Sequence, residues 1–201
     1  QLSGFTCSAP RSLPRSAFST GVQRPIGEVA VIVVTADRGL CGAFNANIIK
    51  AAAHHVRSNF GELHASGNVH LVTVGRKGAD FFGKNGYTVA SKHVGIFAGL
   101  QFGNAQTIVT EAVQGFLDGT YDRVDVVYNE FKSVISQKVV MEQLLPMAPI
   151  EADTAGPVTE TEYLYEPSAQ RIFDILLKRL VEAQVLRALV ESNAAFYASQ
   201  M

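Results

Sequence analysis

The hydrophobic positions of this chain follow two alternating periods. Residues 29–35 form a continuous run of mostly apolar, β-branched side chains, which predicts a strand buried on both faces. After a glycine-rich turn, the apolar residues of 43–57 recur at helical spacing. The alternation continues with predicted strands over 70–74, 87–91 and 124–128, and predicted helices over 76–84 and 104–117. Strands that alternate with helices favour an α/β fold with a mostly parallel, Rossmann-like sheet and flanking helices.

The pattern changes after residue 128. Residues 134–145 predict a further strand, paired with its predecessor through a hairpin at Lys132 and Ser133, so that the sheet gains a late antiparallel edge. Ala, Thr, Pro and Gly then prevail, which is typical of a linker.

The last segment predicts one long helix. Pro167 and Ser168 favour its start, and no breaker follows before the end of the chain. About thirty residues at about 1.5 Å each span roughly 45 Å, more than a domain of this size absorbs. Ile172, Leu176 and Leu180 share one face. We therefore expect the helix to project, or to pack against a helix outside this sequence, and to leave an apolar stripe unpaired.

The expected organisation has four parts. Residues 1–24 contain prolines, serines and arginines but no acid, which fits either an irregular tail or a transit-like segment. Residues 25–150 form the α/β domain, 151–166 the linker and 167–201 the helix. Because the chain starts with Gln1 and stops at Met201 inside a helical pattern, we expect a fragment or a processed chain.

Composition narrows the functional classes. The 201 residues include 47% hydrophobic and 17% charged residues, enough for a packed core, and the formal net charge is −1. That charge does not favour nucleic acid or an anionic membrane surface as a partner. No apolar run reaches about 18 residues, so membrane association would come through partners. Cys7 and Cys41 do not form a disulfide framework, and no metal-ligand spacing or cofactor motif occurs.

The turn at 36–42 is the most distinctive local motif. A strand, a glycine turn and a helix can cradle a phosphate, but this turn lacks both the G-x-G-x-x-G and the G-K-[ST] patterns. Cys41 lies near a predicted helix start and beside Arg38, two features that favour a reactive thiolate, yet no motif links it to a histidine. A tight turn with a packed cysteine is the preferred interpretation. A small α/β enzyme or a nucleotide-binding domain that uses Asp37–Gly42 and Cys41 is the alternative.

Several stretches in register resemble the gamma subunit of F-type ATP synthases. They are 34–48 (VTADRGLCGAFNANI), 74–82 (VGRKGADFF), 128–146 (YNEFKSVISQKVVMEQLLP), 165–177 (YEPSAQRIFDILL) and 183–201 (AQVLRALVESNAAFYASQM). The resemblance implies a non-catalytic central-stalk rotor whose two long helices form an antiparallel coiled coil, while ATP chemistry occurs on the beta subunits. It implies alpha, beta and epsilon subunits and the c-ring as partners, and no cofactor. It places the protein peripherally on an energy-transducing membrane: the cytoplasmic face of a bacterial plasma membrane, or alternatively the mitochondrial inner membrane or the thylakoid.

The resemblance also assigns roles to residues of this chain. Candidates for rotor–stator contact are Asp37, Arg38, Gly39, Leu40, Cys41 and Gly42. Candidates on the rotor helix are Leu186, Leu189, Val190, Glu191, Ser192, Gln200 and Met201. The sequence departs from the family at both ends. The amino-terminal helix is not recognisable, and Ser199, Gln200 and Met201 stand where the family usually has an alanine–arginine–methionine run. These departures leave two interpretations open: a truncated subunit, or an adaptor that has kept the fold but lost rotation.

Overall fold

The computed structural model describes residues 25–134, 136–147, 166 and 169–201, and its centre is a five-stranded sheet in the order β3-β2-β1-β4-β5. The strands are β1 (Val29–Val34), β2 (Val69–Val74), β3 (Thr88–His93), β4 (Arg123–Ser133) and β5 (Ser136–Leu145). Strands β1 to β4 are parallel, and β5 pairs antiparallel with β4 at one edge. The predicted sheet with a late antiparallel edge is confirmed.

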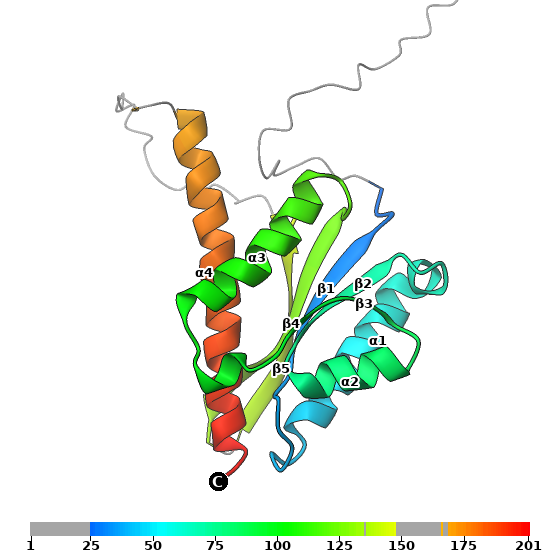
Figure 1. The fold of residues 1–201 in the computed structure, drawn as a ribbon, viewed down its shortest axis with the longest axis vertical. Coiled ribbons are helices and arrows are strands. Elements are labelled where there is room, and N and C mark those ends of the chain that lie inside the picture. Colours follow the sequence, from blue (N-terminus) through cyan, green and yellow to red (C-terminus); the bar gives the residue numbers. More distant parts are fainter. Residues whose placement is uncertain (1–24, 135, 148–165, 167–168) are drawn as a thin grey trace, which may run out of the picture.

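Helices cover both faces of this sheet. They are α1 (Phe44–Ala65), α2 (Arg76–Lys84), α3 (Phe102–Leu117) and α4 (Ala169–Ala198), with a short 3₁₀ helix η1 (Ile96–Ala98) before α3. Helices α1 and α2 lie on one face and α3 and α4 on the other (Figure 1). Right-handed crossovers require this division, because the chain runs outward from β1 to β3 and then returns past β1 to β4.

The core forms around β1. All six of its residues are buried, as the continuous apolar run predicts for a strand covered on both faces. Ile48 and Val56 of α1 and Ile108 and Ala112 of α3 contribute buried side chains to the same core. Their spacing of four or eight residues places each pair on one helix face.

Several predicted boundaries were wrong. Helix α1 continues to Ala65, beyond the predicted end at 57, although Phe60 breaks its geometry with φ −134° and ψ 30°. Strand β4 runs to Ser133, so the predicted hairpin at Lys132 and Ser133 is two residues early, and the turn lies between Ser133 and Ser136. Both errors arise in polar segments, where the hydrophobic period that defines an element fades.

The expected projection of the last helix is wrong for most of its length. Val181, Val185, Leu189 and Phe196 of α4 are buried in the domain core. The backbone N–H of Asn129 in β4 also donates a hydrogen bond to Ser192 Oγ, at 3.0 Å. The helix carries apolar residues on two faces, and the inner one completes the cover of the sheet.

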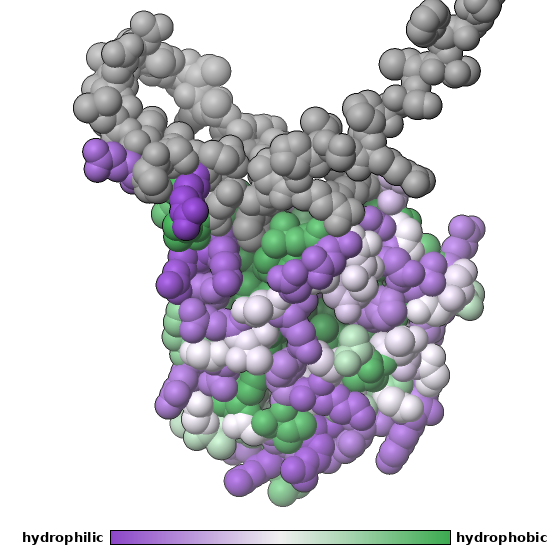
Figure 2. Space-filling model, turned by 45° about the horizontal axis from the view of Figure 1, so that its top comes forward, coloured by the Kyte–Doolittle hydropathy of each residue, from purple (hydrophilic) through white to green (hydrophobic). Residues whose placement is uncertain are grey.

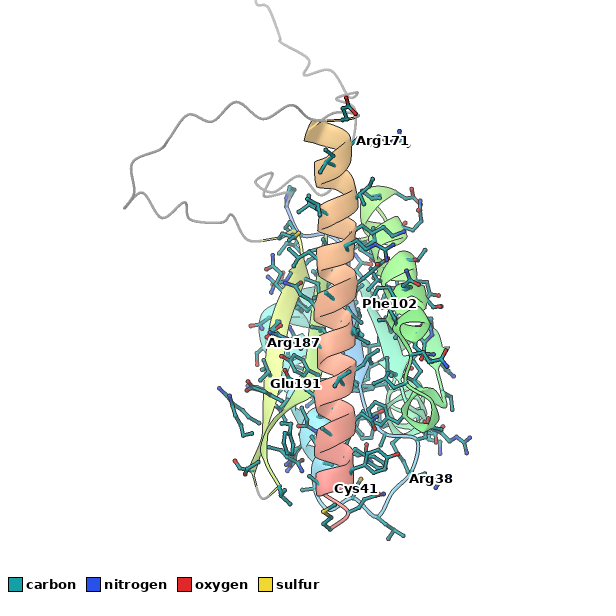
Figure 3. All side chains as sticks on the ribbon, turned by 90° about the vertical axis from the view of Figure 1, so that its left-hand side faces the viewer. Arg38, Cys41, Phe102, Arg171, Arg187 and Glu191 are labelled. Atoms are coloured by element: carbon teal, nitrogen blue, oxygen red, sulfur yellow. The ribbon has the colours of Figure 1, made fainter. Side chains whose placement is uncertain are left out.

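The expected unpaired stripe is nevertheless present on the outer face of α4. Ile175, Leu176 and Val190 are 56%, 58% and 48% exposed. In Figure 3 the outer side of α4 faces the viewer, with the β4–β5 hairpin on one side and α3 on the other. Elsewhere apolar side chains reach the surface as separate patches between polar ones, as Figure 2 shows for one face.

Neighbouring residues of α4 should therefore differ sharply in their contribution to stability. Leu189→Ala removes a fully buried side chain and should lower the free energy of unfolding by about 2–4 kcal/mol. Val190→Ala, its exposed neighbour, should change it by less than about 1 kcal/mol. Urea unfolding followed by circular dichroism measures both. Equal losses would mean that α4 does not pack on the sheet.

Candidate interaction sites at the turn after the first strand and on the last helix

The turn Asp37–Gly42 lies at the carboxyl end of β1, beside η1 and the end of α4. Phe196 of α4 contacts Phe44 and Phe97 with ring centroids 5.8 Å apart in each case. A hollow of about 170 Å³ opens here between the turn, η1 and the last turn of α4. Figure 3 shows Arg38 and Cys41 at the same end of the molecule as the end of α4.

Asp37 holds three segments of this edge together. Its Oδ1 accepts a hydrogen bond from the backbone N–H of Arg76, at 3.1 Å, and its Oδ2 accepts one from Gly95, at 3.0 Å. Arg76 is the first residue of α2, where a carboxylate also meets the positive end of the helix dipole. The carboxylate is therefore a structural clamp between the turn, α2 and the segment after β3.

Next to this clamp, the end of β1 and the start of α2 approach each other closely. Thr35 Oγ1 donates to the carbonyl of Val74, at 2.8 Å, and accepts from the N–H of Gly78, at 2.9 Å. Gly75 adopts φ +88°, and a Cβ at this position would collide with the carbonyl oxygen of Thr35. The segment 74–82 (VGRKGADFF) thus supplies Gly75 and Gly78 where β1 and α2 approach each other.

Cys41 is a packing residue in this arrangement. Its side chain is 1% exposed, and its sulfur accepts a hydrogen bond from Asn45 Nδ2, at 3.1 Å. The other polar partner of the sulfur in the described part of the chain is the carbonyl oxygen of Arg38, at 3.9 Å. Neither group is a base that could generate a thiolate, so the geometry does not support a catalytic cysteine.

The outward residues of the turn are Arg38 and Leu40. Leu40 is 99% exposed and adopts φ +60°, a left-handed conformation that costs a non-glycine residue about 1–2 kcal/mol. Because its side chain is almost fully exposed, Leu40 buries too little apolar surface within the described part of the chain to offset this strain. The six predicted contact residues therefore divide into an inward pair, Asp37 and Cys41, and an exposed tip around Leu40.

The outer face of α4 is the second candidate site. Leu176, Ala183, Val190 and Tyr197 lie seven residues apart along the chain and are all exposed; we call them the outer stripe. A seven-residue repeat of this kind is the seam that one helix offers to another in a coiled coil. The repeat is present in the sequence, but Ala183 and Tyr197 give no distinct signal there because alanine and tyrosine fit many positions.

The predicted rotor-helix residues do not share one face. Leu189 and Ser192 are buried against the domain, whereas Val190, Gln200 and Met201 are exposed. Leu186 and Glu191 are intermediate. The buried members, Leu189 and Ser192, are not accessible to another chain, whereas the exposed members are.

A polar cluster anchors α4 to the hairpin. Arg187 Nη2 lies 2.7 Å from Glu142 Oε2 of β5 and donates to the Tyr128 hydroxyl of β4, at 3.2 Å. The Tyr128 hydroxyl donates to Glu142 Oε1, at 3.0 Å. Burial, together with this hydrogen bond to Glu142, raises the pKa of Tyr128 to about 12.

Comparisons with known proteins agree on one family. An ATP synthase gamma chain of Chlorobaculum tepidum is 45% identical over 176 residues, which cover 88% of this chain and 60% of the relative. The gamma chain of Chlorobaculum parvum is 46% identical over 178 residues, with the same coverage. A family model described as ATP synthase matches residues 7–201. This chain belongs to the ATP synthase gamma chain family. It spans about 60% of the length of these relatives.

A solved structure supports the fold of this gamma-family chain. The central stalk and c-ring structure of Tetrahymena thermophila mitochondrial ATP synthase contains a chain that superposes with a TM-score of 0.66. The match covers 88% of this chain and 75% of that one, at 23% sequence identity. At this identity the match shows that the fold is shared.

Neither gamma-family site has the donor set of a metal centre. Within residues 25–134, 136–147 and 169–201, no three His, Cys, Asp or Glu side chains converge as metal ligands. Over the same residues, no helix combines the length and the apolar character that a bilayer crossing requires. The outer stripe offers an exposed apolar contact surface, and the turn offers the apolar side chain of Leu40 beside the cation of Arg38.

Loss of the Asp37 clamp should loosen the carboxyl edge locally. Asp37→Ala should lower the free energy of unfolding by about 1–2 kcal/mol, because two backbone N–H groups lose their acceptor. Hydrogen exchange should accelerate at the amides of Arg76 and Gly95. Asp80→Ala, an exposed carboxylate on α2, is the control and should leave both amides unchanged. Unchanged exchange in Asp37→Ala would contradict the clamp.

Proposed function

We propose that this chain belongs to the central-stalk rotor subunit of an F-type proton-translocating ATP synthase, and that it couples rotation to ATP synthesis on the beta subunits without catalysing a reaction itself. The observation that carries the proposal is the division of α4 into two apolar faces. One face is buried in the domain core, and the other carries the exposed outer stripe. This arrangement joins a rigid base to a helix that is ready to pair.

A rotor needs a shaft that cannot slip on its base. Buried apolar packing fixes α4 against the sheet, and the Arg187–Glu142–Tyr128 cluster fixes it against the hairpin. Pairing of the outer stripe with a second long helix would stiffen the shaft further. The expected coiled coil of the family is consistent with the seven-residue spacing of the stripe.

The exposed tip of the Asp37–Gly42 turn is the proposed contact with the stator. Leu40 offers an apolar anchor and Arg38 a cation, and the Asp37 clamp holds both on a rigid edge. Rotation changes affinity at a distant site only if such contacts differ between rotational states. A strained but rigidly supported leucine suits this task, because its position is set by the fold.

The proposed partners are the alpha, beta and epsilon subunits and the c-ring. No nucleic acid is proposed as a partner, and contact with the membrane is indirect, through the c-ring. The Tetrahymena structure comprises a central stalk together with a c-ring, which supports the c-ring as a partner here. We propose a peripheral location on an energy-transducing membrane. The Chlorobaculum relatives favour the cytoplasmic face of a bacterial plasma membrane, with the mitochondrial inner membrane and the thylakoid as alternatives.

The domain division follows from the same proposal. Residues 25–150 would be the α/β base and 167–201 the start of the rotor helix, with 151–166 as a linker and 1–24 as a tail or transit-like segment. Residues 1–24 and most of 148–168 lie outside the described residues. The burial of α4 means that the base and the helix are one packed unit.

Charges on the outer stripe should abolish rotor function. Leu176→Glu with Val190→Glu, introduced into a subunit of full family length, should block coiled-coil pairing and lower ATPase turnover at least tenfold after reconstitution with alpha and beta subunits. Lys178→Glu, on the same helix, changes the net charge equally and is the control, which should keep most of the turnover. Full turnover in the double variant would exclude the stripe as a pairing surface.

Leu40 should matter for coupling more than for stability. In Leu40→Gly the relief of left-handed strain opposes the greater entropy of the unfolded chain, so the free energy of unfolding should change by less than about 1 kcal/mol. Turnover of the reconstituted complex should nevertheless fall, because the apolar anchor is lost. A large loss of stability with normal turnover per folded subunit would assign Leu40 a structural role instead.

A further inference from the structure

A groove of about 880 Å³ lies between α1 and α2. These two helices cover the face of the sheet opposite α4 (Figure 1). Ile49 and Ala53 of α1 and Phe81 of α2 form its apolar part. The ring of Phe81 is 37% exposed and packs edge-on against Phe82, with centroids 5.3 Å apart. The part of α1 that lines the groove extends over residues 45–57, which is roughly 18 Å of helix.

The rim of the groove is cationic. Lys50 and Arg57 come from α1, and Lys77 and Lys84 come from α2. Asp80 is the one acidic residue that lines the groove among the described residues. The chain as a whole has a formal net charge of −1, so this concentration of positive charge is local.

These rim cations are unpaired within the described part of the chain. No carboxylate there lies within ion-pair distance of Lys50, Lys77 or Lys84, and the polar contact of Arg57 is a 3.4 Å hydrogen bond to the Tyr87 hydroxyl. Other cations of the chain do have carboxylate partners at 2.7–2.9 Å, namely Arg123, Lys132, Arg179 and Arg187. The groove therefore keeps an uncompensated positive rim around an apolar floor.

We propose that this groove binds an acidic helical segment of a partner protein. A helix of about three turns matches the groove in length. Apolar side chains at i, i+4 and i+7 would contact Ile49, Ala53 and Phe81, and carboxylates on both flanks would meet the rim cations. Fixed apolar contacts would supply affinity, while the charges would favour acidic partners and speed association.

The chemistry of the groove favours a polypeptide over a nucleic acid. A polynucleotide brings phosphates along its whole length, and these would meet the carboxylate of Asp80 and the apolar floor. An amphipathic helix can keep carboxylates on its flanks and leave the position opposite Asp80 uncharged. The segment 151–162 of this same chain is also acidic, with Glu151, Asp153, Glu160 and Glu162, and is therefore tested as a competing occupant.

The groove is separate from the outer stripe, whereas its rim residue Lys77 comes close to Gly39 of the Asp37–Gly42 turn. The outer stripe lies on α4, on the other side of the sheet. A direct binding measurement on the chain therefore tests the groove whether or not the chain assembles into a rotary complex.

Fluorescence anisotropy provides the test. The probe is a labelled 14-residue amphipathic peptide of Leu, Ala and Glu, with Leu on one helical face and Glu on both flanks. It should bind the chain at least tenfold more tightly than the peptide in which Lys replaces Glu, and more weakly as salt rises from 50 to 300 mM, as expected for a charged rim. It should also bind more tightly than a labelled single-stranded oligonucleotide or a peptide of residues 151–162.

Matched variants locate the binding site. Lys50→Glu with Lys84→Glu should weaken binding of the acidic peptide at least tenfold. Lys92→Glu with Lys138→Glu, two exposed lysines on β3 and β5, makes the same change in net charge and should have less than a threefold effect. Phe81→Ala should weaken binding, whereas Phe102→Ala, at a similar exposure of 39%, should not.

Three results would overturn the proposal. The first is equal affinity for the Glu and Lys peptides. The second is an equal effect of the groove and control variants, which would indicate general charge attraction. The third is tighter binding of the oligonucleotide or of the 151–162 peptide, which would assign the groove to another occupant.

Discussion

The packing of α4 against the sheet is the interaction on which the rest of the structure depends. Val181, Val185 and Leu189 close the face of β1 and β4 that α3 leaves uncovered, so the helix is part of the hydrophobic core. Burying one such side chain contributes about 1.5–3 kcal/mol, and the inner face buries several. The same contacts fix the direction of the outer stripe. A change that weakens the core would therefore also misdirect the surface proposed for pairing.

At the carboxyl edge of the sheet, hydrogen bonds fix the Asp37–Gly42 turn, as apolar packing fixes α4. The two oxygens of Asp37 satisfy backbone N–H groups from two other segments, so the turn cannot move without exposing unsatisfied donors. Cys41 and Asn45 close the turn from the inside. The result is a rigid edge whose outermost side chain is an apolar residue with positive φ. Strain of this kind persists only where the surroundings determine the conformation, and here they do.

Much of the fold follows from the sequence, because buried strands and amphipathic helices have distinct hydrophobic periods. The apolar run of β1 and the helix α2 lie within a residue of their predicted positions. The sequence did not reveal that α4 packs on the sheet, since a helix with two apolar faces gives a weak periodic signal and its partner strands are distant in sequence. Nor did it reveal the role of Asp37, whose hydrogen-bond donors come near it only after β2 and β3 pair. The sequence did not reveal the groove for the same reason, because its rim residues Lys50 of α1 and Lys84 of α2 come together only when the two helices pack in the folded chain.

The arrangement of these surfaces has a mechanical consequence. The sheet separates the α1–α2 groove from the outer stripe, and its central strand is buried on both faces. Close-packed protein interiors have low compressibility and transmit strain. A load applied at the groove or at the turn would therefore reach α4 through β1 and β4 with little local yielding. A partner bound to the α1–α2 face would therefore be coupled mechanically to α4 without touching it.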